Sequence, residues 1–320
     1  MLLTRPLFSP SARLAGNPMQ VSRADLGDLS YFIAIANHRS FRRAAVELGV
    51  SASALSHAIS GLEERLGVRL LNRTTRSVTL TAAGEELHAT IQTQIDDIGQ
   101  ALERLNLYRD TPAGRVRINL LEDAATLILE PVMPIFVDRY PDVELDISVN
   151  NRMIDVIGGG FDAGIRYGGT VPEDLIAQRL SSDIQWVAAA APSYLARFGK
   201  PETPGQLQDH RCVRIRLGND QIYQWAFERE GETVNVQAPG QLTVDESHAA
   251  LGLGLRGVGI IYGAEPILRP HIESGALECV LEDWASMGAG YHIYYSSRRQ
   301  LPTGLRLLIE LIRELRPCGL

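Results

Sequence analysis

The chain contains 320 residues, 45% of them hydrophobic and 22% charged, with a formal net charge of −7. At about 150 residues per domain, this length predicts roughly two domains with proper cores. The balanced composition excludes a largely disordered or collagen-like chain. The apolar runs fall far short of the ~20 residues that a membrane helix needs, which excludes a helical membrane protein.

The first segment and the cysteines indicate the compartment. Pro6 and Pro10 interrupt the apolar run near the N-terminus, which disfavours a secretory signal. The three cysteines are widely spaced and lack a CxxC pair, so we expect reduced thiols. We therefore expect a cytoplasmic protein in which residues 1–21 form a disordered extension, with initiation at Met19 as the alternative.

Positive charge gathers in the first quarter of the chain. Residues 1–81 contain ten arginines and five acids, a net charge of +5, so the remaining residues carry −12. This asymmetry favours a polyanion bound by the first eighty residues alone. The alternative is that a net charge of +5 over 81 residues is unremarkable and indicates no polyanionic partner.

Three short helices are predicted after residue 22. Apolar residues recur at three- to four-residue spacing within 29–36, 41–48 and 55–66. Ser40 and Ser51 are suited to cap the second and third helices, and Gly49 to end the second. Two short helices joined by a tight turn form a helix-turn-helix, whose second helix enters the major groove of DNA.

The polar face of the third helix is the candidate base-reading surface. Ser53, Ser56, His57 and Ser60 lie opposite its apolar stripe. Their short donors and acceptors can reach base edges or phosphate oxygens. A solvated polar face is the alternative.

Two short β runs, 68–71 and 78–80, bracket a polar loop and predict a wing. Arg73 and Arg76 at its tip are placed to reach phosphates or a narrow minor groove. If Arg73 contacts a phosphate, Arg73→Ala lowers the slope of log affinity against log salt by about one. A solvated hairpin is the alternative.

A long helix without proline is predicted from residue 82 to about 108. Its apolar stripe repeats with a period of 3.6 residues from Leu87 to Leu105. Such a helix is roughly 40 Å long, more than one small domain covers, so we expect the stripe to pack on a second copy. A twofold dimer presents two recognition helices about one DNA turn apart and predicts a partly palindromic operator.

Residues 41–84, FRRAAVELGVSASALSHAISGLEERLGVRLLNRTTRSVTLTAAG, resemble the N-terminal domain of LysR-type transcriptional regulators. The resemblance implies a winged helix-turn-helix at 22–81 and a linker or dimerisation helix at 82–110. It assigns to the start of the recognition helix and to the wing the DNA-binding residues Ser51, Ser53, Ser56, His57, Arg73, Thr74 and Arg76. Ala52 stands where many members carry Pro or Gln, which leaves the base preference open.

Residues 111–320 alternate β and α patterns, which predicts an α/β fold with a parallel sheet and helical crossovers. The expected elements include strands at 115–120, 143–149, 161–166, 185–191 and 291–295 and helices at 124–140, 246–255 and 303–315. Their order is similar to that of the LysR-type effector domain, a two-lobed α/β fold like that of periplasmic binding proteins. The resemblance implies one lobe of about 114–181 and 282–320, and a second of about 182–281.

A ligand in such a fold binds between the lobes, beyond the carboxyl ends of strands. We assign to this effector pocket the residues Leu121, Glu122, Asp123, Arg166, Tyr167, Asp245, Glu246 and Ser247, and also Ile261 to Gly263, which follow a late strand. Capping of helix N-termini is a nearly equally supported role for the four acids. Many relatives bind carboxylates, but four acids beside Arg166 weaken anion binding, so a neutral or amine-bearing effector has equal support.

The sequence lacks the motifs of an enzyme or a metal site: HExxH, GxSxG, a P-loop, and His and Cys at metal spacing. A GxGxxG match from Gly252 precedes a strand, the reverse of the order in a dinucleotide site. We therefore predict a transcriptional regulator without cofactor that binds double-stranded DNA, a small-molecule effector and a second copy of itself. The resemblance adds a tetramer and contact with RNA polymerase; no membrane partner is expected. A solute-binding protein and a DNA-architectural protein without a ligand are the alternatives.

Overall fold

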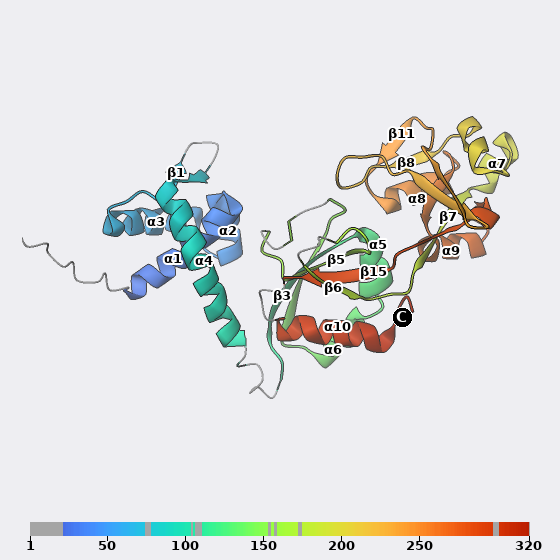
Figure 1. Ribbon diagram of the computed structural model, residues 1–320. Helices are drawn as coiled ribbons and strands as arrows, with labels where there is room; N and C mark the ends of the chain where they lie inside the picture. Colours follow the sequence, from blue (N-terminus) through green and yellow to red (C-terminus); the bar gives the residue numbers. More distant parts are fainter. Residues whose placement is uncertain are drawn as a thin grey trace, which may run out of the picture. The chain divides into compact units, whose positions relative to one another are not determined.

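The computed structural model describes residues 22–73, 78–103, 105, 111–152, 155–156, 159–171, 175–296 and 301–319 (Figure 1). The chain divides into two compact units, Met1–Ile95 and Asp96–Leu320. Each unit is described by itself. The expected extension at 1–21 lies outside the described residues.

The N-terminal unit is a small helical domain with a β-hairpin. Its elements are α1 (Arg23–His38), α2 (Phe41–Leu48), α3 (Ala52–Leu66), the antiparallel strands β1 (Leu71–Arg73) and β2 (Val78–Leu80), and the part of α4 (Ala82–Glu103) up to Ile95. Phe32 of α1 and Leu55, Ile59 and Leu62 of α3 are fully buried in its core. The predicted apolar stripe of the third helix therefore faces inward, and its polar face remains outside.

Local capping begins the helices where the sequence predicts. Ser40 Oγ accepts a hydrogen bond from the backbone N–H of Arg43, and Ser51 Oγ from that of Ala54. Gly49 ends α2 in the left-handed conformation, with φ of 65°. Because Gly lacks Cβ, it adopts this conformation without steric cost, and the turn between α2 and α3 is kept short.

The first wing strand lies farther along the chain than the predicted 68–71. The backbone N–H groups of Leu70 and Leu71 both donate to Glu63 Oε1 of α3, over 2.8 and 3.0 Å. These bonds hold the chain against the helix, so the strand ladder begins only at Leu71. The predicted start of the strand was wrong because the apolar run 68–71 does not reveal that the Glu63 carboxylate accepts hydrogen bonds from the backbone N–H groups of Leu70 and Leu71.

Gly84 fixes the start of α4 against the hairpin. A Cβ on Gly84 would lie 2.1 Å from the carbonyl oxygen of Leu70. Thr81 Oγ1 accepts from the Gly84 N–H over 3.0 Å and donates to the Arg69 carbonyl over 2.7 Å. The backbones are therefore close enough that only glycine fits. The described helix ends at Glu103, and residues 106–108 of the predicted helix lie outside the described residues.

The second unit contains a five-stranded sheet in the order β4-β3-β5-β15-β6. The strands are β3 (Gly114–Leu120), β4 (Val143–Val149), β5 (Ala163–Tyr167), β6 (Ile176–Arg179) and β15 (Tyr291–Tyr295). Figure 1 shows α6 (Met133–Arg139) and α10 (Thr303–Leu315) on one side of this sheet. Val116, Ile118 and Leu120 belong to the buried core that includes residues of both helices.

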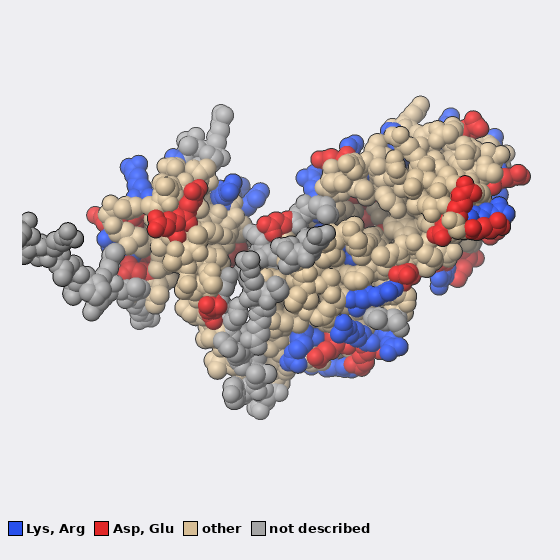
Figure 2. Space-filling model, viewed as in Figure 1, with Lys and Arg blue, Asp and Glu red and all other residues tan. Residues whose placement is uncertain are grey.

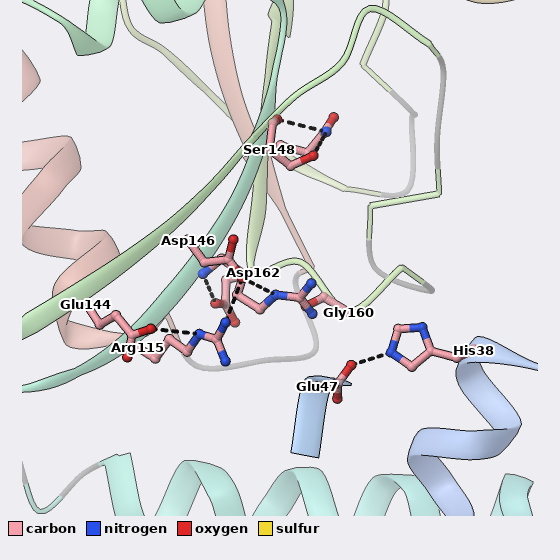
Figure 3. A network of polar contacts seen from close by, with 10 residues as sticks. His38, Glu47, Arg115, Glu144, Asp146, Ser148, Gly160 and Asp162 are labelled. Atoms are coloured by element: carbon pink, nitrogen blue, oxygen red, sulfur yellow. Dashed lines mark hydrogen bonds and ion pairs between the residues drawn. The ribbon is translucent and has the colours of Figure 1, made fainter. Parts of the chain in front are cut away.

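The alternate residues of β3 form a polar ladder with β4 (Figure 3). Asp146 accepts hydrogen bonds from Arg115 Nη2, over 2.8 Å, and from Arg117 Nε, over 3.0 Å. Asn119 Nδ2 donates to the carbonyl of Ser148 over 3.0 Å. This strand therefore has one apolar and one polar face, as its alternating sequence requires.

The second sheet of this unit is built around β7 (Ile184–Ala190). Its neighbours are all antiparallel to it: β12 (Ile261–Ala264), β13 (Glu278–Val280) and β14 (Ser286–Gly288). Two smaller sheets pair β8 (Val213–Ile215) with β11 (Leu242–Val244) and β9 (Trp225–Arg229) with β10 (Glu232–Val236). The associated helices are α7 (Pro192–Phe198), η3 (Pro204–Asp209), α8 (Ser247–Leu255), α9 (Glu265–Glu273) and η4 (Glu282–Trp284).

The expectation of a parallel sheet with helical crossovers was wrong in part. β3 is parallel to both β4 and β5, but β15 is antiparallel to β5 and β6. β15 returns from the second sheet instead of following a helical crossover, so it enters in the opposite direction. A pattern of alternating helices and strands does not specify these strand directions.

The single helix predicted at 124–140 is broken into three pieces. They are α5 (Glu122–Ala124), the π-helical turn η2 (Ala125–Leu129) and α6. Pro131 and Pro134 follow η2 and lack backbone N–H donors, which prevents a continuous helix from forming through this stretch.

Two short crossing segments, residues 181–183 and 289–290, connect the sheets. The Leu180 N–H donates to the Tyr291 carbonyl, and the Tyr291 N–H donates to Ser181 Oγ, each over 2.8 Å. A Cβ on Gly290 would lie 2.0 Å from the Ser182 carbonyl oxygen. The two segments therefore run in direct backbone contact.

Candidate DNA-binding surface and ligand cavity

The outer face of α3 presents part of the predicted base-reading set. Ser53, His57 and Ser60 are exposed, whereas Ser56 is half-buried. Ser51 Oγ caps the helix and also shares a 2.9 Å hydrogen bond with Ser53 Oγ. Ser53 and His57, one helical turn apart, are thus placed on the solvent face, while Ser51 shapes the helix start.

Arg73 lies along α3 rather than at the end of a free hairpin tip. Its Nη1 donates to Ser56 Oγ over 3.0 Å, and its Nη2 to Glu63 Oε2 over 3.2 Å. Its guanidinium carbon is 5.0 Å from the centre of the Phe41 ring. These contacts fix the first wing strand to the recognition helix. Thr74 and Arg76, the other assigned wing residues, lie outside the described residues.

Further basic side chains surround this surface. Arg42 and Arg43, in the first turn of α2, and Arg69, before the wing strand, are exposed. The Arg-Arg pair directly after the capping Ser40 is the sequence signal that could have identified two of them. Figure 2 shows basic side chains at two places on the visible face of the N-terminal unit, with acidic side chains between them.

Arg65 is engaged within the fold. It donates to Asp25 Oδ1 over 2.9 Å and to Asp28 Oδ2 over 2.6 Å, both on α1. Hydrogen bonds from Ser22, and then from Arg65, lower the pKa of Asp25 to about 2. This arginine therefore holds α3 to α1 and contributes less charge to the surface than the sequence count implies. A second local ion pair joins His38 to Glu47 of α2 (Figure 3).

The distal part of the α4 stripe is uncovered. Leu87, Ile91 and Ile95 pack on the core of the N-terminal unit. Ile98 and Leu102 are 52% and 63% exposed. Apolar side chains on the same stripe thus change from buried to exposed along one helix, as expected where a partner would pack.

A cavity of about 390 Å³ lies within the second unit, between residues of the two sheets. Nine of the eleven assigned effector residues line it: Leu121, Asp123, Arg166, Tyr167, Asp245, Ser247, Ile261, Tyr262 and Gly263. Glu122 and Glu246 instead line an adjoining cavity of about 540 Å³. The volume of the first cavity falls in the range typical of small-molecule sites.

Aromatic rings form one wall of the 390 Å³ cavity. Trp186, Tyr223 and Tyr262 line it together with Tyr167. The Trp186 ring lies 5.3 Å from Tyr167 and 5.7 Å from Tyr262, between ring centres. Tyr262 belongs to the segment assigned to the pocket from the sequence, but Trp186 and Tyr223 were missed, because single aromatic residues within strands and loops have no spacing that distinguishes a cavity wall from a core.

Asp123 is a buried carboxylate at this cavity, with only 6% of its surface exposed. Its Oδ2 accepts hydrogen bonds from Tyr167 Oη, over 3.0 Å, and from Ser247 Oγ, over 3.3 Å. Its Oδ1 is buried and has no hydrogen-bond partner among the residues that the structure describes. Burial raises the pKa of the Asp123 carboxyl, and the hydrogen bonds from Tyr167 and Ser247 oppose that shift.

Arg166 is the other deeply buried charge, with 3% exposure. Its acceptors are all neutral oxygens: the carbonyls of Ile165, Asn150 and Arg152 and the side-chain oxygen of Asn119. Burial lowers the pKa of the guanidinium. Arg166 therefore holds together the ends of the strands and the loop that follows β4.

Hydrogen bonds join the first sheet's loops to the start of α8. Glu122 Oε1 lies 2.9 Å from His248 Nδ1, and Glu122 Oε2 accepts from the His248 N–H over 3.3 Å. Asn151 Nδ2 donates to the Asp245 carbonyl over 3.0 Å. The alternative capping role thus applies to Glu122, which bonds to a backbone N–H in the first turn of α8. Glu246, at the N-cap of α8, makes no side-chain cap bond.

The described part of the chain shows neither a metal-binding cluster nor a membrane-spanning helix. Within it, no group of three or more His, Cys, Asp or Glu side chains is arranged to hold a metal ion. No helix there is both long enough and apolar enough to cross a membrane.

A helix-turn-helix unit followed by a two-sheet domain with a ligand-sized cavity defines a ligand-responsive DNA-binding regulator. The sequence matches agree with this class. Residues 26–85 match the bacterial regulatory helix-turn-helix protein, lysR family, and residues 109–317 match the LysR substrate binding domain. The chain therefore belongs to the LysR family of transcriptional regulators and is not an enzyme.

Similar proteins span nearly the whole chain. A transcriptional regulator of Pseudomonas aeruginosa is 40% identical over 93% of this chain and 97% of its own length. The regulator YcaN of Escherichia coli is 37% identical, over 91% of this chain and 95% of its own.

Solved structures confirm the predicted fold class. CrgA of Neisseria meningitidis is 27% identical, with a TM-score of 0.58 over 90% of this chain and 98% of its own. AphB, the virulence activator of Vibrio cholerae, is 24% identical, with a TM-score of 0.64 over 91% and 99%.

Proposed function

We propose that this regulator reads duplex DNA with Ser53 and His57 on the outer face of α3. The observation that carries the proposal is their exposure on a helix whose opposite face is fully buried. Because the buried face fixes the helix in the domain, the exposed side chains are held in defined positions. Short polar side chains allow close approach to base edges in the major groove.

We further propose that Arg42, Arg43 and Arg69 contact phosphates. Their charges are exposed, and among the described residues no ion pair engages them. Phosphate contacts add affinity that depends on salt and not on sequence. Arg76 remains proposed as a wing contact from the sequence alone.

A second copy of the chain is the proposed partner of α4. The exposed apolar side chains of Ile98, Leu102 and Leu105 support this proposal. Pairing along such a helix would give two recognition helices and a partly palindromic operator. We also propose the tetramer, the contact with RNA polymerase and the cytoplasmic location expected from the family resemblance.

The 390 Å³ cavity is the proposed effector site. Its lining comes from both sheets. Glu122 and Asp123 accept hydrogen bonds from residues at the start of α8, and Asn151 donates one to the Asp245 carbonyl. A ligand among these residues would bias the angle between the sheets, which is how its binding would change promoter activity. The proposed lobes are 114–181 with 282–320, and 182–281, although β14 within the former pairs with β7.

DNA binding by the purified full-length protein tests this function. Fluorescence anisotropy would measure its affinity for DNA from upstream of its own gene and for a shuffled fragment of equal length. We expect at least a hundredfold preference for one genomic fragment. His57→Ala should cost about 1–3 kcal/mol on that fragment and leave the shuffled fragment unchanged. Equal affinity for all fragments would contradict the proposal.

A further inference from the structure

Two buried charged residues, Asp123 and Arg166, line the proposed effector cavity, and they differ in whether their hydrogen-bonding atoms already have partners. This inference rests on the proposed effector role of that cavity and concerns the class of ligand. Asp123 and Arg166 carry opposite charges and both line the cavity. Their presence alone therefore favours neither an anionic nor a cationic ligand.

Their hydrogen bonds distinguish them. Both terminal nitrogens of Arg166 already donate to neutral protein oxygens. A ligand carboxylate would have to displace backbone carbonyls or the Asn119 amide from this arginine. Asp123, by contrast, has one oxygen satisfied twice and the other without any donor. A buried charged oxygen without a donor is costly, and a ligand that supplies one relieves that cost.

The donors around Asp123 are consistent with an ionised carboxylate. Tyr291 Oη lies 2.9 Å from Tyr167 Oη, and Tyr167 Oη lies 3.0 Å from Asp123 Oδ2. A chain in which Tyr291 donates to Tyr167 and Tyr167 donates to Asp123 leaves both carboxylate oxygens as acceptors. The missing partner of Oδ1 is therefore a donor.

The cavity wall favours a positively charged donor. The rings of Tyr167, Trp186, Tyr223 and Tyr262 line the cavity, and their π faces attract cations within about 6 Å. We infer that the effector of this regulator is an amine with an apolar body, whose ammonium group binds Asp123 beside these rings. Oδ1 is now closed off from solvent, and a rotation of the carboxyl about its soft terminal torsion turns it toward the ligand.

Calorimetric titration of the full-length protein tests this inference without DNA. The probes are primary amines from butylamine to 2-phenylethylamine, each with the carboxylate and the alcohol of matching skeleton. We expect the amines to bind about ten- to a hundredfold more tightly than the alcohols, and the carboxylates to bind most weakly. If no amine gives heat, or if a carboxylate binds as tightly as its amine, the inference is overturned.

Variants separate charge recognition from the shape of the cavity. Asp123→Asn should bring the amine-to-alcohol affinity ratio close to one while alcohol binding remains, which also shows that the cavity is intact. Asp209→Asn is the matched control, because this acid of the same unit is exposed and lines neither cavity; its ratio should stay within about twofold of the parent. A ratio unchanged in Asp123→Asn contradicts the inference.

The two hypotheses fail separately. If the protein selects a genomic DNA fragment but prefers carboxylates, the charge assignment fails and the regulator stands. If amines bind as expected but no DNA is selected, the ligand assignment stands and the proposed DNA surface fails.

Discussion

Arg73 donates a hydrogen bond to Ser56 Oγ over 3.0 Å, and this bond ties the wing strand to the recognition helix. Both residues are assigned as DNA contacts from the sequence. In the structure they contact each other, and Glu63 accepts from the same guanidinium. The arginine therefore positions the wing, and its charge is already partly neutralised.

The salt dependence of DNA binding should distinguish Arg73 from Arg42. We predict that Arg42→Ala lowers the slope of log affinity against log salt by about one, because an exposed guanidinium contacts a phosphate. Arg73→Ala should weaken binding with a smaller change in slope, which revises the expectation from the sequence. Anisotropy titrations from 50 to about 200 mM salt would measure both; equal slopes for the two variants would contradict the positioning role.

Gly84 and Gly99 offer a matched pair on one helix. Gly84→Ala should destabilise the N-terminal unit by about 1–3 kcal/mol, because the new methyl group collides with the Leu70 carbonyl. Nothing lies within 4 Å of a Cβ on Gly99, so Gly99→Ala should stabilise α4 by up to about 1 kcal/mol. Thermal unfolding followed by circular dichroism would show the opposite signs; a destabilised Gly99→Ala would refute this description of α4.

The exposed stripe of α4 predicts the effect of a charge on assembly. Leu102→Glu should convert dimers to monomers, because it would place a carboxylate in the apolar contact. Light scattering coupled to size-exclusion chromatography would measure the mass. Met287→Glu is the control, since this exposed apolar residue lies on β14 and not on the α4 stripe, and it should leave the mass unchanged. A dimeric Leu102→Glu protein would place the interface elsewhere.

Burial of Asp123 predicts a gain in stability when its charge is removed. Asp123→Asn retains an oxygen for Tyr167 and Ser247 but eliminates the buried charge. At pH 7 we expect the effector domain to become about 1–2 kcal/mol more stable, or roughly 2–8 °C in Tm. Differential scanning calorimetry measures this change; a less stable variant would show that the ionised group is held favourably.

The pH dependence of stability follows from the same carboxyl. Because its pKa in the folded protein is raised above 3.8, the folded state binds this proton more tightly than the unfolded chain. The cost of burying the charge is full above the raised pKa and is relieved as pH falls toward 3.8. Other titratable groups face the Asp123 carboxyl, namely Glu122, His248, Tyr167 and Tyr291. Because these groups are present in both proteins, Asp123→Asn measured in parallel serves as the reference. The difference in the free energy of unfolding between the parent protein and Asp123→Asn should shrink as the pH falls.

The sequence predicted local structure where one residue decides it. Ser40, Gly49 and Ser51 begin and end helices at the expected positions, since capping depends on the chain nearby. The direction of β15 in the five-stranded sheet depended on distant partners, and the break at Pro131 on a competing pattern; both were mispredicted. The cavity shows the same division. Asp123 and Tyr262 were found because they lie beside predicted strand ends, whereas Trp186 joins the cavity wall only through the pairing of β7 with β12.

The contact between Gly290 and Ser182 limits how the effector domain can move. Because the two crossing segments lie backbone to backbone, neither can swing without carrying the other. Rotation of one sheet relative to the other about these two segments would therefore be close to a hinge motion with one angle. An effector bound between the sheets would therefore act mainly on the angle between them, and any residue larger than glycine at position 290 would collide with the Ser182 carbonyl and disturb this hinge.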